Sequence, residues 1–133
     1  MPFIRISVTG NAPTHEQVNE LQQKTTQLMA DILGKRPEVT VVTVEHSPAI
    51  HWSIHGHGLS KNQMLAQMEA FITAGINSEQ EKSDFISAAN QMLCAVFNTT
   101  MSPLYVVIVE VAGADWGYDG KTQAFRRLSS DLL

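Results

Sequence analysis

The sequence predicts an α/β (α+β) protein built from a tandem βαβ repeat, in which a four-stranded mixed sheet carries two helices on one face. Two observations support this fold class. The two halves of the chain resemble each other at a constant offset, and each half alternates a β-rich segment, a helical apolar pattern and a second β-rich segment. A helix between two strands of one sheet implies a parallel pair with a right-handed crossover. We therefore expect a single domain over residues 1–133, made of two repeats at about 2–57 and 66–121.

The repeat aligns without a gap. Thr14 to Gln17 and Ser78 to Glu81 both form a capping box, with a hydroxyl at the N-cap and Gln or Glu three residues later. Their offset is 78 − 14 = 64 residues. The same offset relates two further pairs: Trp52 with Trp116, and Gly56 with Gly120. Agreement at several positions in one register indicates a duplicated unit.

In the first repeat, Phe3–Thr9 is β-rich and predicts the opening strand. Gly34 is placed to end the helix that follows, and Val39–Glu45, dense in β-branched residues, predicts the second strand. The helix is predicted from apolar residues that recur at helical spacing: Val18, Leu21, Thr25, Leu28, Met29, Ile32 and Leu33.

In the second repeat, Gln67–Thr73 and Leu104–Val111 predict the two strands. The intervening helix is predicted from Phe85, Ala89, Met92, Leu93, Val96 and Phe97. The tryptophan–glycine segments should form hairpin-like turns after the second and fourth strands, whereas the tail from Lys121 to Leu133 has no clear pattern. A sheet covered on one face leaves its other face in need of a partner, so we expect an oligomer.

Composition narrows the function classes. The net charge is −4 with no basic block, which argues against nucleic acid as the main partner. The single cysteine, Cys94, allows no intrachain disulfide. No apolar stretch approaches the roughly 20 residues of a membrane span, and the N-terminus lacks signal-peptide features. We expect a soluble cytoplasmic protein with no membrane partner and no cofactor.

Proline at position 2 is the leading chemical candidate. Removal of Met1 would leave Pro2 as a free secondary amine at the end of the first strand. A secondary amine is a good base and nucleophile. If Met1 stayed in place, the Pro2 nitrogen would be a tertiary amide without basicity.

A βαβ repeat that begins at a processed N-terminal proline resembles the tautomerase superfamily over roughly Pro2 to Gly120. Short members such as oxalocrotonate tautomerase carry one βαβ unit and assemble as hexamers, and longer members carry two and assemble as trimers. This chain is similar to the long type. The resemblance implies a homotrimer with the fold of the tautomerase and macrophage migration inhibitory factor group.

The resemblance also implies site residues. Trp52 and Trp116 match an aromatic residue that walls the active site of the short family. Lys35, directly after Gly34, matches a lysine that lies beside the proline in macrophage migration inhibitory factor. Tyr105 matches a tyrosine that a neighbouring subunit supplies there, whereas Val107 stands where that family has an asparagine.

The arginines that bind substrate in oxalocrotonate tautomerase have no counterpart. The matching positions are near Ala12 or Pro13 and at Val41 in the first half, and near Ile76 or Asn77 and at Tyr105 in the second. The arginine pair of cis-chloroacrylate dehalogenase is also missing from Ile76–Glu79. The resemblance therefore implies the family without fixing a substrate.

The chemistry of an amine at Pro2 suits proton transfer. Burial and a nearby cation, Lys35 or Arg36, both disfavour the charged amine and move its pKa towards neutrality, where a general base works best. Lys35 and Tyr105 are candidates to stabilise an enolate. We expect a tautomerase-like isomerase acting on a small anionic enol or 2-oxo acid. The alternatives are a non-catalytic binding or signalling protein of the same fold, or a hydratase or dehalogenase in which a protonated Pro2 acts as an acid.

Several residues also have structural interpretations. Lys35 at a helix C-terminus is favourable for the helix dipole alone. The two tryptophans can simply anchor turns, and Arg126-Arg127 fits a solvated pair, although it could reach an acidic substrate in a trimer. His51, His55 and His57 lie in a predicted turn without a carboxylate, so we interpret them as polar turn residues and expect no metal site.

Overall fold

One mixed four-stranded sheet forms the centre of the computed structural model, which describes residues 2–131. Its strand order is β2-β1-β5-β6. The strands are β1 (Phe3–Thr9), β2 (Val41–Ser47), β5 (Ala66–Thr73) and β6 (Tyr105–Val111). β1 and β2 are parallel, as are β5 and β6, and the two pairs meet where β1 runs antiparallel to β5. This confirms the predicted mixed sheet.

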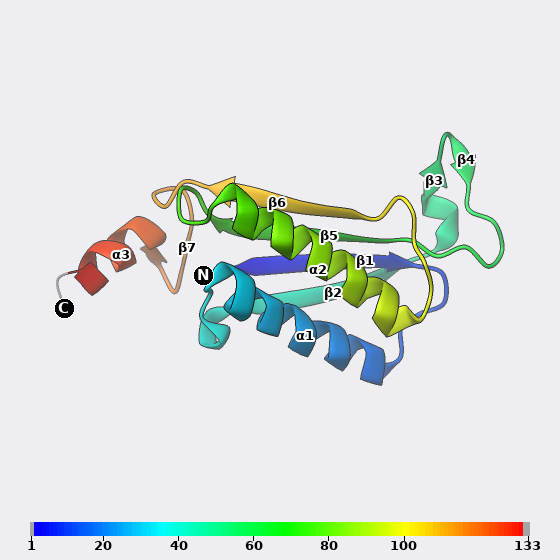
Figure 1. Ribbon diagram of the computed structural model, residues 1–133, viewed down its shortest axis with the longest axis horizontal. Coiled ribbons are helices and arrows are strands. Elements are labelled where there is room, and N and C mark those ends of the chain that lie inside the picture. Colours follow the sequence, from blue (N-terminus) through cyan, green and yellow to red (C-terminus); the bar gives the residue numbers. More distant parts are fainter. Residues whose placement is uncertain (1, 132–133) are drawn as a thin grey trace.

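Two helices of equal length cover one face of the sheet, α1 (His15–Leu33) and α2 (Glu79–Phe97) (Figure 1). Both predicted capping boxes are formed, at Thr14 and at Ser78. α1 ends at Gly34, whose φ of 69° is left-handed, a conformation that glycine adopts without strain. α2 begins 79 − 15 = 64 residues after α1, so the offset read from the sequence holds in space.

The core lies between the helices and the sheet. Alternate residues of β1 and β5 point to this side, including Ile4, Ile6, Met68 and Ile72, all at 0% exposure. The predicted apolar helix faces supply the other wall, with these buried members: Leu21, Thr25, Met29 and Leu33 from α1, and Phe85, Ala89, Met92 and Leu93 from α2.

Short hairpins follow β2 and β6 at opposite ends of the sheet (Figure 1), as the tryptophan–glycine segments predicted. The first consists of β3 (Ser53–Ile54) and β4 (His57–Gly58), after the turn η2 (Ala49–His51). The second consists of β7 (Gly117–Tyr118) and β8 (Lys121–Thr122).

Two elements differ from the sequence prediction by more than one residue. The second strand begins at Val41 rather than Val39, because Pro37 starts a 3-10 turn, η1 (Pro37–Val39). The tail without a clear pattern contains a third helix, α3 (Gln123–Asp131). Gln123 and Ala124 donate their backbone N–H groups to Trp116 O and Gly113 O, so α3 is fixed to the second hairpin.

The sheet face opposite the helices is open in the single chain. Exposed apolar residues include Val41, Tyr105 and Val107, and the Phe3 and Phe71 rings lie 6.2 Å apart on the same face. Across residues 2–131, no helix has the length and apolar character needed to cross a membrane.

Candidate active site

Pro2 lies at the entrance of β1, and its ring is fully buried. The Pro2 carbonyl oxygen accepts a hydrogen bond from Val41 N at 3.4 Å. Val41 is the first residue of β2, so this bond fixes Pro2 at the edge of the β1–β2 pair. The residue lines a cavity of about 450 Å³. The other lining residues are Phe3, Glu38, Val39, Val41, Trp116, Gly117, Tyr118 and Asp119.

The second hairpin supplies one wall of this Pro2 cavity. β6 runs towards the end of the sheet where β1 begins, and β7 follows it there (Figure 1). Trp116 Nε1 donates a hydrogen bond to Thr73 Oγ1 at 3.2 Å, which fixes the indole beside the end of β5. Pro2 and Trp116 therefore line the same cavity within one chain.

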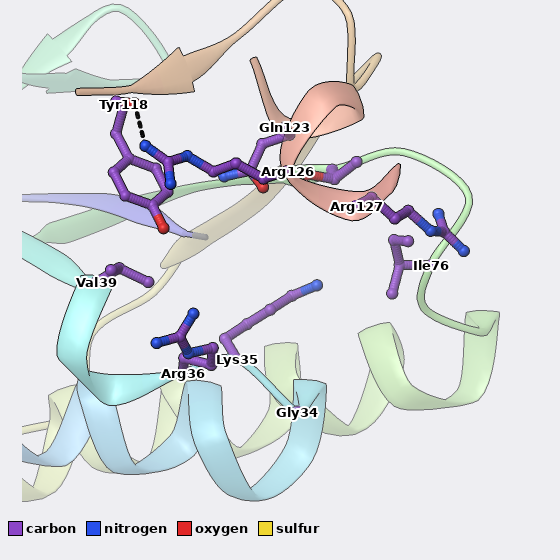
Figure 2. Close-up of a pocket in the computed structure, with 10 residues that line it drawn as sticks. Gly34, Lys35, Arg36, Val39, Ile76, Tyr118, Gln123, Arg126 and Arg127 are labelled. Atoms are coloured by element: carbon purple, nitrogen blue, oxygen red, sulfur yellow. Dashed lines mark hydrogen bonds between the residues drawn. The ribbon is translucent and has the colours of Figure 1, made fainter. Parts of the chain in front are cut away.

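A second cavity, of about 410 Å³, adjoins the first and shares Val39 and Tyr118 with it. We call it the basic cavity, because four cationic residues line it: Lys35, Arg36, Arg126 and Arg127. Figure 2 shows Lys35 and Arg36 projecting from the end of α1, with Tyr118 and Arg126 on the opposite side of the open space.

Lys35 is buried, with 8% of its surface exposed. Its backbone N–H donates to Met29 O at 3.0 Å, so the left-handed end of α1 turns the residue inward. Burial lowers the pKa of its ammonium group, and the charges of Glu81 and Glu110 partly oppose this. Within residues 2–131, no carboxylate oxygen lies within 4.0 Å of Lys35 Nζ.

The two nearby carboxylates have other partners. Glu81 accepts the backbone N–H of Ser78 in the α2 capping box, and this bond is the main cause of its lowered pKa. Glu110 accepts from Lys82 Nζ and from Gly75 N. Among the described residues, Lys35 is therefore a buried cation that forms no ion pair and interacts with Glu81 and Glu110 only at longer range.

Arg126 is held against the hairpin. Its guanidinium carbon lies 3.8 Å from the centroid of the Tyr118 ring, and Nη2 donates to Tyr118 O at 2.9 Å. Figure 2 shows this bond and the stacked arrangement. Arg36, in contrast, is exposed and pairs with Glu38 at 3.4 Å.

The chain does not bring all the predicted residues together. Trp52 and Tyr105 line a cavity of about 330 Å³ at the opposite end of the sheet, beside Ala66. Trp52 Nε1 donates to Ser47 Oγ at 2.6 Å there. These two side chains would reach a Pro2 cavity only from a neighbouring subunit.

Sequence reasoning missed Tyr118 and underestimated Arg126. Tyr118 lines both cavities, and its only signal in the sequence is its place in the predicted turn, two residues after Trp116. Arg126 lies in the tail whose helix the sequence did not show. The rings of His55 and His57 are 5.8 Å apart, and residues 2–131 contain no group of three or more potential metal ligands.

Comparison with known proteins agrees with this arrangement. The family model described as "Tautomerase enzyme" matches residues 2–62, from Pro2 through the first hairpin. The curated protein "Probable tautomerase K2" of Dickeya dadantii (strain 3937) is 36% identical over 66 residues, which cover 50% of this chain and 98% of that protein. This chain belongs to the tautomerase family. It is therefore an enzyme of the isomerase type, about twice the length of that relative.

Solved structures show the same fold over nearly the whole chain. The crystal structure of Pt0534 inactivated by 2-oxo-3-pentynoate superposes with a TM-score of 0.82 at 16% identity, covering 93% of this chain and 98% of that one. A wild-type fused 4-OT described as an asymmetric trimer gives a TM-score of 0.79 at 22% identity, covering 92% and 98%. These matches establish the predicted tautomerase and macrophage migration inhibitory factor-like fold.

Proposed function

We propose that this tautomerase moves a proton between carbon and oxygen, or between two carbons of an allylic system, on a small anionic enol or 2-oxo acid. Pro2, freed of Met1, would be the general base. The observation that carries the proposal is the position of Pro2. It is buried directly before the first residue of β1, and it lines a cavity that adjoins the basic cavity with its four cations.

The steps follow from these surroundings. An α-amino group has a reference pKa of about 7.7–8.0, and burial and neighbouring cations both lower it towards neutrality. A neutral Pro2 nitrogen takes a proton from the carbon next to the carbonyl, and the negative charge passes to the carbonyl oxygen. Lys35 stabilises this charge electrostatically, and Tyr105 of a neighbouring subunit can assist it. The proton is then returned to oxygen or to the distal carbon.

We further propose that the active form is a homotrimer. The open sheet face with Val41, Tyr105 and Val107 exposed supports this, as does the trimeric state of the fused 4-OT. In such a trimer Tyr105 and Trp52 of one subunit can complete the Pro2 cavity of another. Light scattering at micromolar concentration tests the assembly, and a stable monomer would contradict it.

Inserting one residue between Met1 and Pro2 tests the base. The insertion makes the nitrogen an amide and leaves the sheet nearly intact. Removal of a general base should reduce kcat/KM by about 10²–10⁴-fold. Phenylenolpyruvate and a 2-hydroxymuconate-type enol are suitable assay substrates, and intact mass shows whether Met1 has been removed from the unmodified chain.

Pro2→Ala is the matched control for this insertion, because it keeps an amine, now primary, at the same place. We expect it to retain part of the activity. If the insertion variant kept full activity with its oligomeric state unchanged, Pro2 would be a structural strand residue and the proposed mechanism would be wrong.

A separate test addresses Lys35. Lys35→Ala should raise the pKa that the pH–rate profile assigns to Pro2 and should raise KM for an anionic substrate, because one cation is lost from the site. If neither quantity changes, Lys35 acts only as a helix-end charge and the cation comes from another residue.

A further inference from the structure

The positive charge of this acidic protein is concentrated at one place. The chain has 9 Lys and Arg against 13 Asp and Glu, yet four of the nine cations line the basic cavity. Among residues 2–131, no aspartate or glutamate lines this cavity. Such a concentration of like charge is electrostatically unfavourable unless an anion balances it.

Two buried donors of α3 are also without partners. Within residues 2–131, Gln123 Nε2 and Arg126 Nε are buried and have no hydrogen-bond acceptor. Both residues line the cavity. Buried donors are normally paired, and an unpaired one is unfavourable, so this pair indicates that an acceptor belongs there.

The arrangement of the donors favours a particular anion. Arg126 is already oriented by the Tyr118 ring and carbonyl, and Lys35 is buried without a carboxylate within 4.0 Å among the described residues. A single carboxylate carries one charge, fewer than the three charges of Lys35, Arg126 and Arg127 that line the cavity beside the Arg36–Glu38 ion pair. A phosphate group carries close to two charges and at least three acceptor oxygens, and guanidinium forks match it.

We propose that the basic cavity binds a doubly charged oxyanion of the phosphate type. Because the cavity shares Val39 and Tyr118 with the Pro2 cavity, the substrate would carry this group away from the reacting carbon. The place of this group on the substrate rests on the function proposed above, whereas the anion site itself does not. α3 provides two of the four cations of this cavity, Arg126 and Arg127.

Titration calorimetry of the full-length protein with inorganic phosphate tests the site, with acetate as the singly charged comparison at matched ionic strength and near-neutral pH. Phosphate should bind at least roughly tenfold more tightly than acetate, which corresponds to about 1.4 kcal/mol. Equal affinity for the two anions, or no binding of phosphate, would overturn the proposal.

Substitution locates the binding. Arg126→Gln and Lys35→Gln should each weaken phosphate binding roughly tenfold, since a hydrogen bond to a charged group contributes about 1.5–3 kcal/mol. Lys61→Gln, which removes the same charge far from this cavity, should leave it unchanged. If all three variants bind phosphate like the parent protein, the site lies elsewhere and the proposal fails.

Arg127→Gln is a variant that should fold normally, because Arg127 is exposed and the loss of its charge should not disturb packing. It should weaken phosphate binding in a protein with an unchanged circular dichroism spectrum. An Arg127→Gln variant that folds and binds phosphate as tightly as the parent protein would count against the cavity.

The Pro2 insertion variant separates the two proposals. It should bind phosphate as the parent protein does while losing isomerase activity. Retained phosphate binding with no isomerase activity in the parent protein would contradict only the proposed function. Isomerase activity without a preference for phosphate would contradict only the anion site.

Discussion

The two ends of the sheet are equivalent in architecture and different in chemistry. Pro2 lies at the entrance of β1 and Ala66 at that of β5, separated by 66 − 2 = 64 residues. Trp116 stands beside the first and Trp52 beside the second. The positions of Lys35 and Arg36 correspond to Thr99 and Thr100 in the second repeat. Duplication preserved the scaffold, whereas the second repeat has no counterpart of the cations Lys35 and Arg36.

The tail explains much of this difference. After the first hairpin the chain continues into β5, but after the second it forms α3, which brings Arg126 and Arg127 to the Pro2 end. In the described part of the chain, no lysine or arginine lines the cavity beside Ala66, and the Ala66 nitrogen is an interior peptide group. A segment outside the repeat therefore provides half of the charge of the basic cavity.

The equivalence of the scaffolds can be tested by a pair of core substitutions. Leu21 and Phe85 occupy corresponding positions of α1 and α2, and both have 0% exposure. Leu21→Ala should cost about 2–5 kcal/mol and Phe85→Ala about 3–5 kcal/mol of unfolding free energy. Urea denaturation measures both. A cost below 1 kcal/mol for either variant, smaller than any such core truncation, would mean that the two repeats do not share the core equally.

A matched tryptophan pair tests the difference between the two ends. Trp116→Ala should raise KM roughly tenfold, because about 1.5–3 kcal/mol accompanies burial of a large apolar side chain against a ligand. Trp52→Ala should have a smaller effect. Steady-state kinetics with one substrate compare them. Equal losses would show that Trp52 of a neighbouring subunit contributes as much to the Pro2 cavity as Trp116 does, and would remove the functional asymmetry.

The smallest expected effect concerns Lys35 and pH. Its native pKa lies below 10.5, so between these two values the unfolded chain binds more protons than the folded one. Stability should therefore increase as pH rises through the native pKa, and level off above 10.5. Urea unfolding at several pH values should show this rise in the parent protein and lose it in Lys35→Met. An identical rise in both would assign the effect to another group.

The fold could be predicted because its signals are local and occur twice. The capping boxes at Thr14 and Ser78, the apolar helix faces and Gly34 each specify nearby backbone, and all were confirmed. The second strand was placed two residues early, since Pro37 acts on the turn before it. α3 was missed because its position depends on hydrogen bonds to Gly113 and Trp116 rather than on an apolar pattern.

The candidate site was less accessible to sequence reasoning. Pro2, Trp116, Lys35 and Arg36 do come to one end of the sheet, as their motifs suggested. The contact between Arg126 and Tyr118 joins a helix to a hairpin through a cation–π pair and one hydrogen bond. Neither residue carries a local signal for that contact, so its consequence for the basic cavity is visible only in three dimensions.

The continuous peptide chain from Leu65 into Ala66 also determines how many reactive ends an assembly can have. Six single units could each offer a chain terminus, whereas three fused chains offer three. Under the proposed mechanism, an irreversible inhibitor directed at the Pro2 amine would label one site per polypeptide. In a trimer it would label the three Pro2 positions and none of the three equivalent Ala66 positions. The three sites beside Ala66 would then be under no selection for catalysis, and their residues could diverge as long as the sheet still formed.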